Sequence, residues 1–353
     1  MMNKKAEHAF RLIDSVYLLR NEQVTDHAKR CVLRMLFVQI DNLLAIVPQI
    51  KNRLPNRSFE EKQIRKAIEE GLIRLKHSFH NSFDLIRDRL AAHSQPIELT
   101  SLFAWWSALD YAVVEILYGD VKEIQSSLEA ADLRFLPIPD YQSLRVPKSS
   151  KLAPLASPVI SLDRLAFSRQ NTAYSIPLHQ SQEKEQIILS IIEFLDVDFA
   201  LMCLVNNPST TYSSSLFEVA WMLAAMDLCS LVDNLFEDTE YDKSLLEYWK
   251  GDMDGYASLV ALNASRDIAL EIKIREFRNK YAAHIDQKIP LHESKSLFEN
   301  ADLTRIHEYA HQVVNGFRET CRKDIRTGTF LIHNAKLCNV SDANNKGAPF
   351  EDQ

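Results

Sequence analysis

The chain has 353 residues, of which 46% are hydrophobic and 25% are charged, an ordinary globular balance in a length that allows two domains. Only 7 residues are glycine, and strong helix formers are abundant, which favours an all-α protein. The formal net charge of −7 argues against a broadly basic protein that coats nucleic acid, because phosphate neutralisation needs clustered Lys and Arg. A small local basic cleft is still allowed.

The cysteines and the N-terminus indicate a cytoplasmic protein. The five cysteines are odd in number and no pair has CxxC spacing, which favours reduced thiols that pack as small hydrophobic groups. The first residues, MMNKKAEHAFRLID, have no apolar run suited to a signal peptide. No uninterrupted apolar stretch is long enough to predict a membrane span, so we expect no membrane association.

Residues 1–135 are predicted to form a first helical bundle. Residues 32–47 space their apolar side chains over a broad helix face. Pro48 and Pro55 are predicted to bracket a connection. A long helix is expected over residues 58–92, because Ser58 followed by Glu61 is a capping-box pattern.

The amino-acid composition changes in residues 136–181, which contain six of the twelve prolines and many serines. This stretch predicts an extended linker. Residues 182–338 are predicted to form a second helical bundle, and residues 339–353 a polar tail. The helical patterns of the second bundle cover residues 183–195, 215–236, 266–284 and 296–325.

One short motif occurs twice with similar surroundings. RDRLAAHSQ begins at Arg87 and RNKYAAHID begins at Arg278, an offset of 191 residues (278 − 87). Two further short matches keep the same order: DNL recurs after 192 residues (233 − 41), and SLF recurs after 195 residues (296 − 101). The collinear spacing predicts two diverged copies of one helical domain.

At these residues the chain resembles the HEPN superfamily of small helical bundles, whose motif is Arg, four to six residues, then His, often with a polar residue after the Arg. The two matches are Arg87-Asp88 with His93, and Arg278-Asn279 with His284. The resemblance implies two tandem HEPN-like antiparallel bundles related by an internal pseudo-two-fold axis. Many members of the superfamily are metal-independent ribonucleases in which two motifs meet in one cleft.

The motif residues suit metal-free cleavage of RNA. A histidine can take the proton of a 2′-hydroxyl, because its ordinary pKa is near 6.5. An arginine can bind the phosphate and stabilise its charge. The candidate catalytic residues are therefore Arg87, His93, Arg278, Asn279 and His284. In the first copy Asp88 cannot donate a hydrogen bond when ionised, so that copy is expected to bind or orient the substrate.

Polar residues inside apolar helical stretches are further candidates for the same cleft. They are Asp41 and Asn42 in the first copy and Asp233 and Asn234 in the second. The equal alternative is that they form buried hydrogen bonds between helices.

The expected function is a metal-independent endoribonuclease without a cofactor, acting as a defence or toxin effector with RNA or nucleotide as ligand. An antitoxin or regulatory protein is an expected partner, and the composite cleft could form within one chain or in a homodimer. The main alternative is a non-catalytic module that binds RNA, nucleotide or a protein. A distant third is a zinc hydrolase, because HEYAH at residues 307–311 fits HExxH.

Overall fold

The computed structural model describes residues 2–21, 26–82, 111–131, 155, 180–206, 214–238, 242–250, 255–283, 296–297 and 300–323. Most of these residues are helical and none of them lies in a strand, which confirms the all-α prediction. Arg87, Asp88, His93 and His284 lie outside the described residues, as do the tail and, apart from residues 155, 180 and 181, the predicted linker.

The described helices overlap the predicted helical stretches, but one of them extends from Gln180 to Asn206 and the last begins at Leu303 and not at residue 296. In the first part of the chain they are α1 (Met2–Leu18), α2 (Asp26–Arg53), α3 (Phe59–Ser82) and α6 (Tyr111–Ala130), with a 3-10 turn at Leu19–Asn21. In the second part they are α8 (Gln180–Asn206), α9 (Ser214–Phe236), α10 (Leu245–Tyr248), α11 (Tyr256–Ala264), α12 (Ile268–Phe277) and α14 (Leu303–Lys323), with a π-helical turn, η4 (Arg278–Ala282), after α12. The sequence patterns do not predict the short helices α10 and α11.

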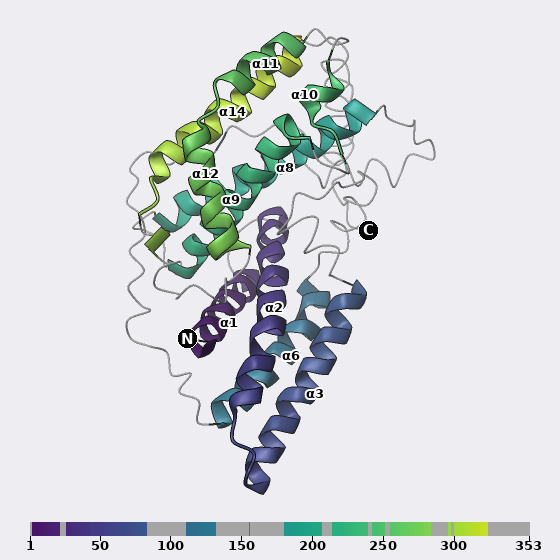
Figure 1. Ribbon diagram of the computed structural model, residues 1–353, viewed down its shortest axis with the longest axis vertical. Helices are drawn as coiled ribbons and strands as arrows, with labels where there is room; N and C mark the ends of the chain where they lie inside the picture. The colour runs from purple at the N-terminus through teal and green to yellow at the C-terminus, as the bar shows by residue number, and fades with distance from the viewer. Residues whose placement is uncertain are drawn as a thin grey trace, which may run out of the picture.

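The helices pack in pairs around a shared centre (Figure 1). Helix α1 packs on α2, α3 on α6, α8 on α9, and α11 on α14. Helix α1 also lies against α9, and α8 lies against α2. The α3–α6 pair and the α11–α14 pair lie at opposite ends of the molecule. Because α1 contacts α9 and α2 contacts α8, the first and second parts of the chain share one hydrophobic core.

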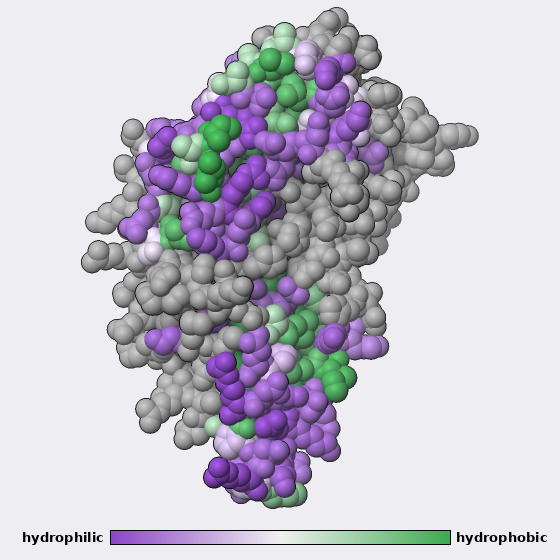
Figure 2. Space-filling model, viewed as in Figure 1, coloured by the Kyte–Doolittle hydropathy of each residue, from purple (hydrophilic) through white to green (hydrophobic). Residues whose placement is uncertain are grey.

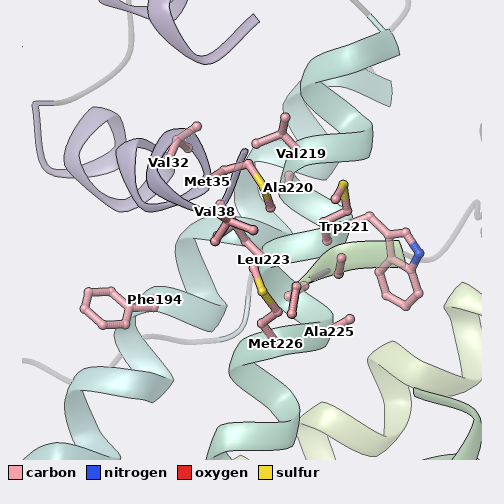
Figure 3. Close-up of a cluster of buried hydrophobic side chains, with 14 of the residues drawn as sticks. Val32, Met35, Val38, Phe194, Val219, Ala220, Trp221, Leu223, Ala225 and Met226 are labelled. Carbon is pink, nitrogen blue, oxygen red and sulfur yellow. The ribbon is translucent and has the colours of Figure 1, made fainter. Parts of the chain in front are cut away.

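The centre of the core lies where α2, α8 and α9 meet (Figure 3). Val32, Met35 and Val38 of α2 lie beside a row of side chains from α9, and Phe194 of α8 belongs to the same buried cluster. Helix α9 is buried along nearly all of its length, because apolar residues cover it on every side.

Helix α2 contains the one stretch among the described residues, Ala28–Arg53, that is apolar and long enough to span a membrane. Most of that stretch is buried against other helices, as in the core helix of a soluble protein.

A buried ion pair in the core links α2 to α9. The guanidinium of Arg34 donates two hydrogen bonds of 2.8 Å to the carboxylate of Asp227, and its Nη2 lies 3.8 Å from Asp198 on α8. The Arg34 guanidinium also lies 4.0 Å from the centre of the Phe194 ring. Burial, and then the neighbouring carboxylate of Asp227, raise the pKa of Asp198 well above its ordinary value. The protonated form of Asp198 is thereby favoured.

The start of α3 confirms the predicted capping box. The Ser58 hydroxyl accepts a hydrogen bond of 3.1 Å from the backbone N–H of Glu61. In return the Glu61 carboxylate accepts one of 2.9 Å from the backbone N–H of Ser58. Two backbone N–H groups without partners in the helix are thus satisfied.

The prediction that Pro48 begins a connection is wrong, because α2 continues through it to Arg53. Proline removes one backbone hydrogen bond and crowds the preceding turn. Val47 and Ile50, on either side of Pro48, are both buried. Their packing favours the helix and outweighs the local preference of proline.

The described part of the face shown in Figure 2 is mostly hydrophilic. Besides the exposed Leu18 and Phe59, apolar side chains are exposed over two pairs of helices. One pair is α3 and α6, where Ile73 and Ile116 are exposed. The other pair is α11 and α12, where Val260, Ile268 and Ile272 are exposed.

Candidate functional site

The second motif begins where α12 changes into a wider turn. The backbone N–H of Ala283 donates a hydrogen bond of 2.8 Å to the carbonyl of Arg278, an i to i+5 contact. Such π turns inside helices are rare and often occur at functional sites. The turn stops at the last residue before His284.

The wide turn bears directly on the spacing of the motif. In an ideal α-helix, residues six apart differ by about 240° around the axis, so Arg278 and a helical His284 would face different ways. A π turn holds more residues, so each advances by a smaller angle. It therefore changes the direction in which the residues after Arg278 point, relative to an ordinary α-helix.

Arg278 is tied to α9 while its guanidinium stays partly accessible. Its Nη1 lies 3.8 Å from Oδ2 of Asp233, and the Arg275 guanidinium donates a hydrogen bond to Oδ1 of the same carboxylate. The Arg278 side chain is 19% exposed and that of Asp233 is 14% exposed. Asp233, a predicted cleft residue, therefore lies beside the motif arginine.

Among the described residues, positive charge is in excess around Arg278. Arg275 and Arg278 share one carboxylate, that of Asp233. Glu276, which lies between them on α12, is paired with Lys280, and Glu271 on the same helix accepts hydrogen bonds from Arg266. An anion approaching Arg278 from solvent would therefore meet a net positive group.

Asn279 follows Arg278 and is exposed. Nε of Arg278 donates a hydrogen bond of 3.0 Å to Oδ1 of Asn279. Because the Asn279 side-chain oxygen accepts this hydrogen bond, the side-chain N–H groups of Asn279 are left as donors toward solvent. Arg278 and Asn279 together can thus present N–H groups to one phosphate.

Two of the remaining predicted cleft residues, Asn42 and Asn234, donate hydrogen bonds within their own helices. The side-chain amide of Asn234 donates to the carbonyl of Ser230 at 2.7 Å. Asn42 is buried and donates to Gln39 Oε1 at 3.3 Å. Asp41 is half-buried on α2. The contacts of Asn42 and Asn234 lie within one helix each and are not hydrogen bonds between helices.

The nearby thiol of Cys229 is not a nucleophile. Burial raises its pKa to about 12, although Arg278 and Arg275 act in the opposite direction. The thiol is therefore protonated near neutral pH and packs as a small apolar group.

A buried polar group, which sequence reasoning missed, joins α1 to the motif turn. The Glu218 cluster consists of His8 and Arg11 on α1, Glu218 on α9 and Tyr281 in the π turn. Arg11 donates a hydrogen bond of 2.7 Å to Glu218 Oε2, and the Tyr281 hydroxyl donates to Oε1. Nε2 of His8 lies 3.5 Å from Oε1. A glutamate inside the apolar pattern of α9 is the one sign of this cluster in the sequence.

Charge keeps Glu218 ionised despite complete burial. Burial alone would raise its pKa, but His8, Arg11 and the Tyr281 hydroxyl outweigh it, so the pKa lies below its ordinary value. Arg11 also approaches Nδ1 of His8 at 2.9 Å.

A second group has the same chemistry at a different place. The Tyr309 cluster consists of Arg266, Glu271 and Tyr309. The Tyr309 hydroxyl donates to Glu271 Oε1, and Arg266 binds the same carboxylate through both of its oxygens. This cluster joins α12 to α14 and contains no motif residue.

The HExxH pattern brings its two histidines together. Nε2 of His307 and Nε2 of His311 are 3.2 Å apart, and the buried His307 ring packs edge-on against Phe199. Glu308, the general base of such a pattern, is exposed on another side of α14. Among the described residues no group of three His, Cys, Asp or Glu side chains could hold a metal ion.

We therefore expect purified protein to contain far less than one equivalent of zinc, because two histidines alone are a weak site. His307→Ala should leave RNA cleavage unchanged. Metal analysis by plasma mass spectrometry and a cleavage assay check both points. Zinc near one equivalent that is lost in His307→Ala would contradict this expectation.

Comparisons with protein-family models, with curated proteins and with solved structures found no match to this chain.

Proposed function

We propose that the chain is a metal-independent endoribonuclease made of two HEPN-like helical bundles. The observation that carries the proposal is the wide turn that ends just before His284 and presents Arg278 and the exposed Asn279 together. The excess of positive charge there suits a phosphate. By the same resemblance, we propose a cytoplasmic effector of defence or toxin type, controlled by a partner protein.

The proposed reaction needs only side chains of this chain. His284 takes the proton of a 2′-hydroxyl, and the 2′-oxygen attacks the adjacent phosphorus. The bond from phosphorus to the 5′-oxygen breaks, and His93 supplies a proton to that oxygen. Arg278 and Asn279 stabilise the charge on the phosphate, with Arg87 on its other side. The products are a 2′,3′-cyclic phosphate and a 5′-hydroxyl.

The order of helices supports two copies. Helices α1, α2, α3 and α6 correspond in order to α8, α9, α12 and α14. Each copy also packs its first helix on the second helix of the other, α1 on α9 and α8 on α2.

The contact between α2 and α9 supports a pseudo-two-fold axis at their crossing. Two equivalent helices that cross at such an axis touch at equivalent positions, so the contacting residues are separated by the repeat offset. Arg34 and Asp227 are separated by 193 residues, against an offset of 192 between the two DNL matches. Their neighbours Met35 and Met226 both belong to the central apolar cluster (Figure 3).

Cleavage of RNA without metal tests the function. Purified protein with excess chelator should cut an end-labelled single-stranded RNA and leave fragments with 2′,3′-cyclic phosphate ends. The same sequence made as DNA should stay intact, because it lacks the 2′-hydroxyl. Cleavage that requires Mg²⁺, or fragments with 5′-phosphate ends, would contradict the proposed chemistry.

The second candidate is a non-catalytic module that binds RNA or nucleotide. Asp88 favours it, because an acidic residue takes the place that Asn279 has in the other copy. In that case the wild-type protein binds RNA, Arg87→Ala and Arg278→Ala weaken binding, and no fragments form.

A further inference from the structure

Tyr281 lies between Arg278 and His284 and is the described side chain of the motif that is most firmly held. Its hydroxyl donates to Glu218, its ring centre is 5.4 Å from those of His8 and Phe277, and it is only 2% exposed. A contact in the middle of the turn can fix the turn itself.

The partner of Tyr281 is itself fixed from another part of the chain. Glu218 is fully buried on α9, and Arg11 of α1 binds its second oxygen at 2.7 Å. His8, also on α1, lies on the same side as Tyr281. The position of the Tyr281 hydroxyl therefore depends on a carboxylate held by the first helix of the chain.

A wide turn needs such a support. The π-helical hydrogen bond is rarer than the α-helical one, and an unsupported segment would tend to the ordinary α register. That change would rotate His284 relative to Arg278, because the two registers advance by different angles. A displacement of about 1 Å in a catalytic group can lower a rate on the order of 10²-fold.

We propose that Glu218, bound by Arg11, is a positioning residue that holds the turn between Arg278 and His284 through the Tyr281 hydroxyl. This inference rests on the proposed function for its effect on cleavage. The hold on the turn itself can be measured independently of any activity.

The test compares Tyr281→Phe with Tyr309→Phe in the full-length chain. Each change deletes one hydroxyl that donates to a buried carboxylate already bound by an arginine, so the local loss of hydrogen bonding is matched. The measurements are kcat and KM for RNA cleavage in chelator, and hydrogen exchange in peptides that cover residues 278–284.

Tyr281→Phe should lower kcat roughly 10- to 100-fold and change KM less than about twofold, because the phosphate-binding groups remain. Exchange over residues 278–284 should become about tenfold faster. Tyr309→Phe should change none of these quantities. Arg11→Gln should act in the same direction as Tyr281→Phe, and Arg11→Lys, which keeps the positive charge beside Glu218, should recover part of the loss.

Equal loss of activity in both tyrosine variants would overturn the inference, because the effect would then be general destabilisation. Unchanged exchange and unchanged kcat in Tyr281→Phe would overturn it as well. If the wild-type protein cuts no RNA, the proposed function fails, and the exchange contrast between the two variants still decides whether the Glu218 cluster holds the turn.

Discussion

His284→Ala is expected to lower the metal-free cleavage of RNA by about 10²–10⁴-fold, because general acid–base groups typically contribute that much. Arg278→Ala should cost a similar factor, since one donor to a developing phosphate charge is worth about 10²–10³-fold. Initial rates on a labelled RNA, in chelator and with contaminating ribonuclease removed, measure both effects.

Two exposed residues serve as matched controls for these variants. His77→Ala removes a histidine from the surface of α3, and Arg305→Ala removes a guanidinium that is 52% exposed on α14. Both should cleave at the wild-type rate. If the controls lose as much activity as His284→Ala and Arg278→Ala, the assigned roles are wrong.

The first copy supplies the test of a shared cleft. His93→Ala and Arg87→Ala should also impair cleavage, and less than their counterparts if Asp88 limits the first copy to binding or orienting. Full activity in the double variant His93→Ala, His284→Ala would exclude the composite mechanism.

Arg34→Met is expected to destabilise the fold by about 3–5 kcal/mol, because it leaves the buried carboxylate of Asp227 without its partner. Urea unfolding followed by circular dichroism should show a large fall in the midpoint concentration. The double variant Arg34→Met, Asp227→Leu should recover much of the loss, since whole buried ion pairs can be replaced by apolar groups. Unchanged stability in Arg34→Met would contradict the account of the core.

Asp198→Asn tests the protonated state of the second carboxylate beside Arg34. The pKa of Asp198 is higher in the folded state than its ordinary value of 3.8, which applies to the unfolded chain. At a pH between the unfolded-state pKa and the folded-state pKa, the folded chain therefore binds more protons than the unfolded chain. The wild type therefore loses stability as pH rises through that window. The amide in the variant cannot ionise, so Asp198→Asn should give the more stable protein at neutral pH. Its advantage should vanish as the pH falls to the ordinary pKa of 3.8.

Local features of the fold could be predicted from the sequence. Ser58 and Glu61 form their capping box within four residues, and the long apolar stretches of α8 and α9 are helical as the sequence predicts. Pro48 shows the limit of local reasoning. The burial of its neighbours, which depends on other helices, overrides the preference of proline to end a helix.

The candidate site could be predicted only in part for the same reason. The motif marks Arg278 and Asn279, and a polar position in an apolar helix marks Asp233. Tyr281 and Glu218 are 63 residues apart, and nothing in the pattern of either helix indicates their pairing. The change from α to π geometry at Arg278 depends on that pairing and on the close packing of the buried residues beside it, so it could not be derived from spacing.

The contact between Arg11 and Glu218 has a consequence for the synthesis of the protein. The two residues are separated by 207 positions. At a translation rate of about 5–20 residues per second, roughly 10–40 s pass between their appearances on the ribosome. Helix α1 is therefore synthesised well before its partner on α9. The Glu218 cluster needs Tyr281 as well, which follows Glu218 by 63 residues, so the motif turn is fully supported only after Tyr281 has been added to the nascent chain.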